Sequence, residues 1–259
     1  VLSFIWVPRG TIAPKDEIVK NFLVYDRLGD LMDSDFEEIK ENIISKLSQG
    51  ENIKKSDIVS NKILSDIKTS FERIRSNRGL NPPVNAFKLS SKEDDDPILR
   101  KIRENGLENR REDNVKIIFY PVYLNREDEL LGLDYKEALT ASNLGVMLSR
   151  YEPWGYMGHE TAAYGNVSIT TDFTGFGRFV QKHYHMEEVL NPVEVVKAKD
   201  KEREEIVKKD ADIPEIYVKM DKGQRKKTEL LAYEIAKMAC WEEQIKNYIE
   251  SYNSALNKL

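Results

Sequence analysis

The stretch that decides the fold is residues 144–177, LGVMLSRYEPWGYMGHETAAYGNVSITTDFTGFG. Leu144–Leu148 and Val167–Thr171 are short, nearly continuous apolar runs, which are typical of buried strands. Gly158–Tyr164 predicts a helix between them, and Gly175–Tyr184 predicts a helix after the second strand. Short buried strands that alternate with helices are typical of a parallel sheet covered on both faces. The stretch therefore predicts an α/β fold.

Elements of the same kind flank this stretch. Asp96 followed by Pro97 predicts a helix start, because the aspartate can cap the first turn and proline needs no N–H there. The mixed-charge run from Ala198 to Asp210 is typical of a solvated helix or a loop. The other predicted elements are strands at Val1–Val7, Lys116–Tyr120 and Glu215–Lys219, and a helix at Asp134–Ser142.

Two further helices are predicted within residues 28–80. Each has apolar residues three and four positions apart and charged residues on its other faces, which favours an antiparallel helical pair. Such a pair would be either an ordinary peripheral hairpin or a surface that packs on another copy of the chain. The two stripes are Phe36, Ile39, Ile43 and Leu47, and Ile63, Ile67, Phe71 and Ile74.

The C-terminal segment predicts one long helix. Its apolar residues from Leu231 to Leu256 follow one another at intervals of three or four, so one face is expected to pack. Cys240, beside Trp241, is expected to be a small core residue rather than a nucleophile.

Composition narrows the class of protein. The 259 residues are 40% hydrophobic and 33% charged, which suits a globular chain of one large domain. The formal net charge of −5 gives no overall attraction to nucleic acid or anionic lipid, and no run of ~18 apolar residues is present. A single cysteine and the missing export signal favour the cytoplasm. Because the chain opens with Val1 in a strand-like run, we expect it to be part of a longer protein.

The loop after the first strand carries the strongest candidate site. Gly155 and Gly158 would let the backbone approach a ligand, and the helix that follows offers free N–H groups to a phosphate. Glu152 and Glu160, eight positions apart, could face the same crevice and bind hydroxyl groups or a developing positive charge. The alternative is a tight core turn with both glutamates on the surface. A second glycine pair, in Gly175-Phe176-Gly177, favours a crevice.

Other candidate residues are weaker. His183 and His185 would share a face of a strand, but no Cys, His or Asp cluster completes a metal site, so none is expected. His159 could be a base or a phosphate contact, although a partly exposed helix residue is the simpler interpretation.

At this point the residues resemble a known family. The segments Val115–Pro121, Leu131–Glu137, Leu144–Val146, Tyr151–Tyr156 with Glu160, and Thr174–Gly177 resemble the eukaryotic-type glycogen synthases. The resemblance implies the C-terminal, nucleotide-sugar-binding half of a two-domain GT-B glycosyltransferase. It implies a Rossmann-like sheet over residues 1–259, incomplete at its N-terminus. The helical insertion at 28–80 would join subunits into a homo-oligomer.

The resemblance also implies a reaction. Glucose would pass with retention from UDP-glucose to the 4-hydroxyl of an α-1,4-glucan such as glycogen, without a metal or other cofactor. Glu152 would lie near the glucose and Glu160 would hold the ribose hydroxyls. Tyr135 would stack on uracil, and backbone around Trp154 would hold the sugar and diphosphate. The implied substrate-binding residues are Tyr135, Trp154, Gly155, Tyr156, Met157 and Gly158.

Departures from the family pattern keep two alternatives open. The family's Thr-Pro-Ala is here Met157-Gly158-His159, and its arginine-rich regulatory helix is reduced to Arg225-Lys226-Lys227. These differences motivate a non-catalytic module that binds nucleotide or glucan and oligomerises. The other alternative is a synthase that uses ADP-glucose, since base choice depends on the loop Tyr120–Leu124.

Overall fold

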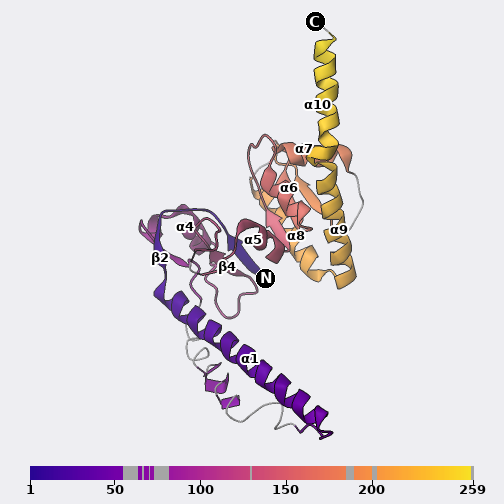
Figure 1. Ribbon diagram of the computed structural model, residues 1–259. Coiled ribbons are helices and arrows are strands. Elements are labelled where there is room, and N and C mark those ends of the chain that lie inside the picture. The colour runs from indigo at the N-terminus through magenta and orange to yellow at the C-terminus, as the bar shows by residue number, and fades with distance from the viewer. Residues whose placement is uncertain are drawn as a thin grey trace. The chain divides into compact units, whose positions relative to one another are not determined.

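The computed structural model describes residues 1–54, 64–65, 67–69, 71–72, 82–128, 130–184, 190–199 and 203–257. The chain divides into two compact units, residues 1–133 and 134–259 (Figure 1). The prediction of one domain over 1–259 stays a prediction. Within the described part of the chain, every helix is too short or too polar to cross a bilayer.

The first unit contains two small sheets. Strand β1 (Leu2–Ile5) pairs in parallel with β4 (Lys116–Phe119), with Leu2 opposite Lys116. Both strands were expected from their apolar runs. Strand β2 (Thr11–Pro14) pairs antiparallel with β3 (Phe87–Leu89). Neither strand had been predicted, because neither segment is a continuous apolar run.

Helix α4 (Pro97–Glu104) covers the core of this unit and begins as predicted. Asp96 accepts hydrogen bonds at Oδ1 from the backbone N–H groups of Ile98 and Leu99, at 2.9 and 3.0 Å. The apolar face of α4 packs with residues from β3 and β4. The cluster consists of Leu89, Leu99, Ile102, Ile117 and Phe119.

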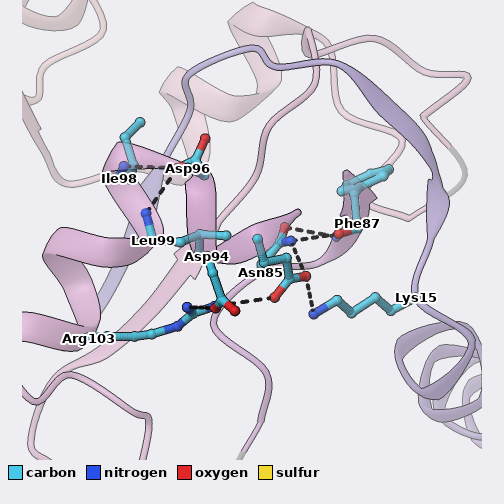
Figure 2. A network of polar contacts seen from close by, with 9 residues as sticks. Lys15, Asn85, Phe87, Asp94, Asp96, Ile98, Leu99 and Arg103 are labelled. Carbon is cyan, nitrogen blue, oxygen red and sulfur yellow. Dashed lines mark hydrogen bonds and ion pairs between the residues drawn. The ribbon is translucent and has the colours of Figure 1, made fainter. Parts of the chain in front are cut away.

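A polar network joins the start of this helix to the neighbouring strand (Figure 2). Glu93, in the short 3-10 helix η2 (Glu93–Asp95), pairs with Lys15 at 2.8 Å and accepts from Asn85 Nδ2 at 2.8 Å. Asn85 also donates to the carbonyl of Phe87 at 2.7 Å. Arg103 reaches Asp94 from α4. The network therefore fixes β3, η2 and α4 to one another.

Helix α1 (Asp16–Ser48) runs out from the strands of this unit (Figure 1). It begins twelve residues before the predicted insertion boundary at 28, because nothing between Asp16 and Leu28 interrupts the helix. The second predicted helix, from Ile63 to Ile74, falls largely outside the described residues. Several apolar side chains of α1 are exposed: Phe22, Leu23, Tyr25, Phe36, Ile44 and Leu47.

The second unit is built on three parallel strands. Strands β5 (Leu144–Val146), β6 (Val167–Thr171) and β7 (Val193–Val196) lie in the order β5-β6-β7. All five residues of β6 are buried. The parallel pairing of β5 with β6 confirms the prediction from their apolar runs, and β7 had not been predicted.

Helices pack around these strands (Figure 1). They are α5 (Tyr135–Ala141), α6 (Tyr156–Ala163), α7 (Gly175–His183), α8 (Arg203–Lys219) and α9 (Lys222–Met238). Helix α6 contacts both β6 and α9. Helices α6, α7 and α9 share a core with β7, which includes Ala162, Phe176, Val180, Val193, Ala232, Ile235 and Ala236.

Two predictions for this unit are wrong. Glu215–Lys219 is the end of α8 and not a strand, because the helix continues through Pro214. The C-terminal helix is two helices, α9 and α10 (Trp241–Leu256), with Cys240 as the half-buried N-cap of the second. Helix α10 extends beyond the rest of the unit, and Trp241 on it is exposed, so its stripe is not packed (Figure 1). The apolar spacing continues through the break, which is why periodicity does not reveal it.

Both units combine helices with short sheets; the sheet of the second unit is parallel, and the first unit has one parallel and one antiparallel pair. The α/β class is therefore confirmed. The described strands form three separate sheets, so the single Rossmann-like sheet stays an expectation.

Candidate functional site

Two strand-to-helix junctions of the second unit lie side by side. The loop between β5 and α6 and the loop between β6 and α7 meet in an isolated parallel bridge of Glu152 with Thr174. The carbonyl of Glu152 accepts from the Gly175 N–H at 3.3 Å, and the carbonyl of Trp154 accepts from the Phe176 N–H at 2.6 Å. The predicted juxtaposition of the two glycine-bearing loops is confirmed.

Glycine is required where the loops touch. A Cβ on Gly175 would lie 2.2 Å from the carbonyl oxygen of Pro153, and a Cβ on Gly177 would lie 2.2 Å from that of Thr171. Gly155, the N-cap of α6, has a φ of 98°, which side-chain-bearing residues rarely adopt. These glycines bring the backbone of the loop 152–155 against the start of α7.

Glu152 is held within this pair of loops. Its carboxylate Oε2 accepts from the Ser149 hydroxyl at 3.2 Å, and the side chain is half-buried. The carbonyl of Ser149 accepts from the Thr171 hydroxyl at 2.7 Å, so the loop is also joined to the end of β6. This fixes the position of one carboxylate beside Gly155.

Glu160 lies in a different environment, and the structure pairs it with Tyr135. Glu160 is exposed on α6, and its Oε2 accepts from the Tyr135 hydroxyl at 2.8 Å. Tyr135 is the first residue of α5, whose N-cap Asp134 forms a capping box with Glu137. Burial of the ring and the adjacent Glu160 carboxylate raise the pKa of Tyr135. Two predicted site residues 25 positions apart are thus in direct contact.

The first turn of α6 provides backbone donors. No side chain caps this helix at Gly155, and Tyr156 and Met157 are 68% and 51% exposed. Unpaired N–H groups and the positive end of the helix dipole favour an anion at such a position. Gly158 faces away from it, because its Cβ position is 3.4 Å from the hydroxyl of Ser168 on β6. Gly158 thus serves the packing of α6 on the sheet.

Trp154 and His159 form a connection that the sequence did not predict. The indole Nε1–H of Trp154 donates to His159 Nδ1 at 3.2 Å, and His159 Nε2 lies 2.8 Å from the carbonyl oxygen of Ala236 on α9. Phe176 stacks on His159 with ring centres 4.9 Å apart. Because Ala236 lies 77 residues from His159 in the chain, no local pattern could have revealed this contact.

The remaining candidates do not extend the site. His183 stacks on Phe179, and His185 lies outside the described residues. Over the parts of the chain that the structure describes, His, Cys, Asp and Glu side chains form no group of three or more suited to a metal ion.

Comparisons with known proteins identify the family of the chain. The family model described as "Glycogen synthase" matches residues 1–259. The chain is 35% identical to human liver glycogen [starch] synthase over 183 residues, which are 71% of this chain and 26% of that protein. It is 31% identical to glycogen [starch] synthase isoform 2 of the yeast Saccharomyces cerevisiae over 210 residues, which are 81% of this chain and 29% of that protein.

Sequence identity is higher over a shorter stretch in a nematode relative. Glycogen [starch] synthase of Caenorhabditis elegans is 44% identical over 89 residues, which are 34% of this chain and 13% of that protein. The alignments with the human and yeast relatives thus cover between a quarter and a third of their lengths. Since the family model covers all residues, the chain belongs to the glycogen synthase family.

Proposed function

We propose that this chain carries the nucleotide-sugar site of a retaining glucosyltransferase. The enzyme transfers glucose from UDP-glucose to the 4-hydroxyl at the end of an α-1,4-glucan such as glycogen. In this proposal the two units belong to the C-terminal half of a GT-B enzyme. Family membership supports the reaction class, and the arrangement of Glu152, Glu160 and Tyr135 supports the location of the site.

The observation that carries the proposal is the contact of Tyr135 with Glu160. A nucleotide needs a flat surface for its base and acceptors for its ribose hydroxyls. The aromatic ring of Tyr135 on α5 and the carboxylate of Glu160 on α6 supply both within one area, since the Tyr135 hydroxyl lies 2.8 Å from Glu160 Oε2. In the proposal the ring stacks on uracil while Glu160 accepts from the ribose hydroxyls.

The uncapped start of α6 supplies the next part of the site. Diphosphate oxygens would accept from the backbone N–H groups at Tyr156 and Met157, where the helix dipole also favours negative charge. Trp154 and Gly155 would hold the glucose through their backbone. No step in this scheme needs a metal.

Glu152 would act at the reacting carbon. Cleavage of the bond between glucose and UDP leaves positive charge on the sugar, and a fixed carboxylate stabilises that charge in the transition state. The contacts of Glu152 with Ser149 and Gly175 keep the carboxylate in place before the reaction. The oxygen of the glucan hydroxyl would bond to the sugar on the same face that UDP leaves, and its proton would pass to the departing diphosphate, which gives retention.

Substrate competition tests the proposal. The complete natural polypeptide is assayed for transfer of labelled glucose to glycogen from UDP-glucose and from ADP-glucose, each in the presence of the other. The proposal expects UDP-glucose to be used and ADP-glucose to compete weakly. Preferential use of ADP-glucose would replace the donor, and no transfer from either would reject the reaction. The present 259 residues alone are expected to show no turnover, because their alignments span only 26% and 29% of the human and yeast relatives.

A non-catalytic function is the second candidate, and Met157 favours it. The family has a threonine at this position, and the exposed Met157 offers no hydroxyl to a phosphate. In that case the protein would bind UDP or maltooligosaccharide without transfer. Calorimetry with both ligands, run beside the activity assay, separates binding alone from catalysis. Either function belongs in the cytoplasm, as the single Cys240 suggests.

A further inference from the structure

His159 has two neighbours whose hydrogen-bonding roles are fixed. An indole N–H can only donate, so His159 Nδ1 must accept from Trp154 at 3.2 Å. A carbonyl oxygen can only accept, so His159 Nε2 must donate to Ala236 at 2.8 Å. One protonation state satisfies both bonds: the neutral imidazole with its proton on Nε2.

Aromatic contacts fix the same two rings. The His159 ring stacks on the Phe176 ring, with ring centres 4.9 Å apart and an interplanar angle of 25°. The Trp154 and His159 rings meet edge to face, with ring centres 5.9 Å apart. The ring centre of Trp154 also lies 6.0 Å from that of Phe176 and 5.9 Å from that of Phe179. The indole is therefore surrounded by α6 and α7, and its only polar atom is bonded to His159.

The hydrogen bond between Trp154 and His159 affects the candidate site because Trp154 belongs to the loop that carries Glu152. Trp154 lies between Glu152 and Gly155, in the loop that holds the predicted catalytic carboxylate and starts α6. The backbone of this loop is bonded to the start of α7. The side chain of Trp154 is bonded through His159 to the carbonyl of Ala236 on α9.

We propose that His159 is a positioning residue that fixes Trp154, and with it the loop carrying Glu152, against helix α9. The effect on transfer rests on the function proposed above. The fixing of Trp154 does not, because it concerns only residues of this unit. Removal of the Nδ1 acceptor frees the indole N–H and loosens the loop, while the contacts of the Trp154 ring with Phe176 and Phe179 remain.

Two amide substitutions separate the two bonds of His159. Asparagine at 159 places an acceptor near the position of Nδ1, and glutamine reaches the position of Nε2. In the complete natural polypeptide, His159→Asn is expected to keep kcat within about threefold and His159→Gln to lower it roughly tenfold, with small changes in donor KM. Equal thermal midpoints for the two variants are required for this comparison.

Trp154→Phe closes a double-mutant cycle, because phenylalanine keeps a ring and removes the donor. The loss of kcat caused by Trp154→Phe is expected to disappear in the His159→Gln background, as for groups that act through one bond. Additive losses, or equal kcat for His159→Asn and His159→Gln, would overturn the proposal.

Hydrogen exchange of the indole gives a readout that needs no activity. The Trp154 Nε1–H resonance, assigned by its loss in Trp154→Phe, is expected to exchange about tenfold faster in His159→Gln than in His159→Asn. Equal exchange would reject the role of His159. If the wild-type protein transfers no glucose, the proposed function fails, and this measurement still decides whether His159 fixes Trp154.

Discussion

Glu152 and Glu160 differ in their surroundings, which predicts different effects of the same substitution. Glu152 is half-buried and bonded to Ser149, whereas Glu160 is exposed and bonded to Tyr135. Glu152→Gln is expected to lower kcat by ~100-fold with little change in donor KM, because it removes charge at the transition state. Glu160→Gln is expected to act mainly on donor KM.

Steady-state kinetics with UDP-glucose on the complete natural polypeptide measure both effects. Glu234→Gln on α9 is the matched control, since this exposed glutamate lies outside the site. A near-normal kcat in Glu152→Gln would remove Glu152 from the mechanism.

Tyr135 predicts a change of stability at alkaline pH. Burial and then Glu160 raise its pKa in the folded protein above the unfolded value of ~10. The folded state therefore holds this proton more tightly, and its contribution to stability is complete below pH ~10 and lost as the pH rises above it. Tyr135→Phe removes this contribution.

The measurement is the thermal midpoint of wild type and Tyr135→Phe between pH 8 and 11. As the pH exceeds ~10, the thermal midpoint of the wild type is expected to fall relative to that of Tyr135→Phe. A difference that stays constant over this range would contradict the raised pKa. Tyr120, whose pKa burial also raises, is present in both proteins and cancels.

At the scale of elements, two glycines predict opposite responses to alanine. Gly175 begins α7, and its Cβ would lie 2.2 Å from Pro153 O, so Gly175→Ala is expected to cost about 1–3 kcal/mol and to displace the Glu152 loop. Gly29 lies within α1 with no atom within 4 Å of its Cβ position. Gly29→Ala is expected to stabilise α1 by up to ~1 kcal/mol.

Chemical denaturation of both variants checks this pair. Gly29→Ala serves as the control for the substitution itself, because the same methyl group is added in open space. A Gly175→Ala protein as stable as wild type would show that the two loops are not packed as described.

At the scale of the whole molecule, α1 predicts self-association. Its exposed apolar side chains have no cover within the described part of their own unit. If these side chains join subunits, the double variant Phe36→Glu with Ile44→Glu is expected to have a lower molar mass of the assembly, measured by sedimentation equilibrium. Tyr123→Glu changes an even more exposed apolar residue outside the helix and is expected to leave the mass unchanged. An unchanged mass in the α1 variant would make this helix a peripheral element.

The proposed reaction also predicts insensitivity to metal removal. Charge on the leaving diphosphate would be neutralised by the backbone N–H groups and the dipole at the start of α6 rather than by a metal. Transfer from UDP-glucose is therefore expected to continue at the same rate after treatment with EDTA. Loss of activity that Mg²⁺ or Mn²⁺ restores would place a metal in the mechanism.

The sequence by itself determined the features that depend on neighbours a few positions away. The apolar runs of β5 and β6, the Asp96 cap of α4 and the glycines at two junctions were all evident from local composition. The candidate loop from Glu152 to Glu160 was also evident, because its residue types form a recognisable motif.

Tertiary structure decided what depends on distant partners. The antiparallel pairing of β2 with β3, the break at Cys240 and the helical state of Glu215–Lys219 each leave the local pattern unchanged or ambiguous. The bond of His159 to Ala236 joins residues 77 positions apart. A periodic pattern specifies which face of an element is apolar, but only the packed chain specifies which distant atom meets that face.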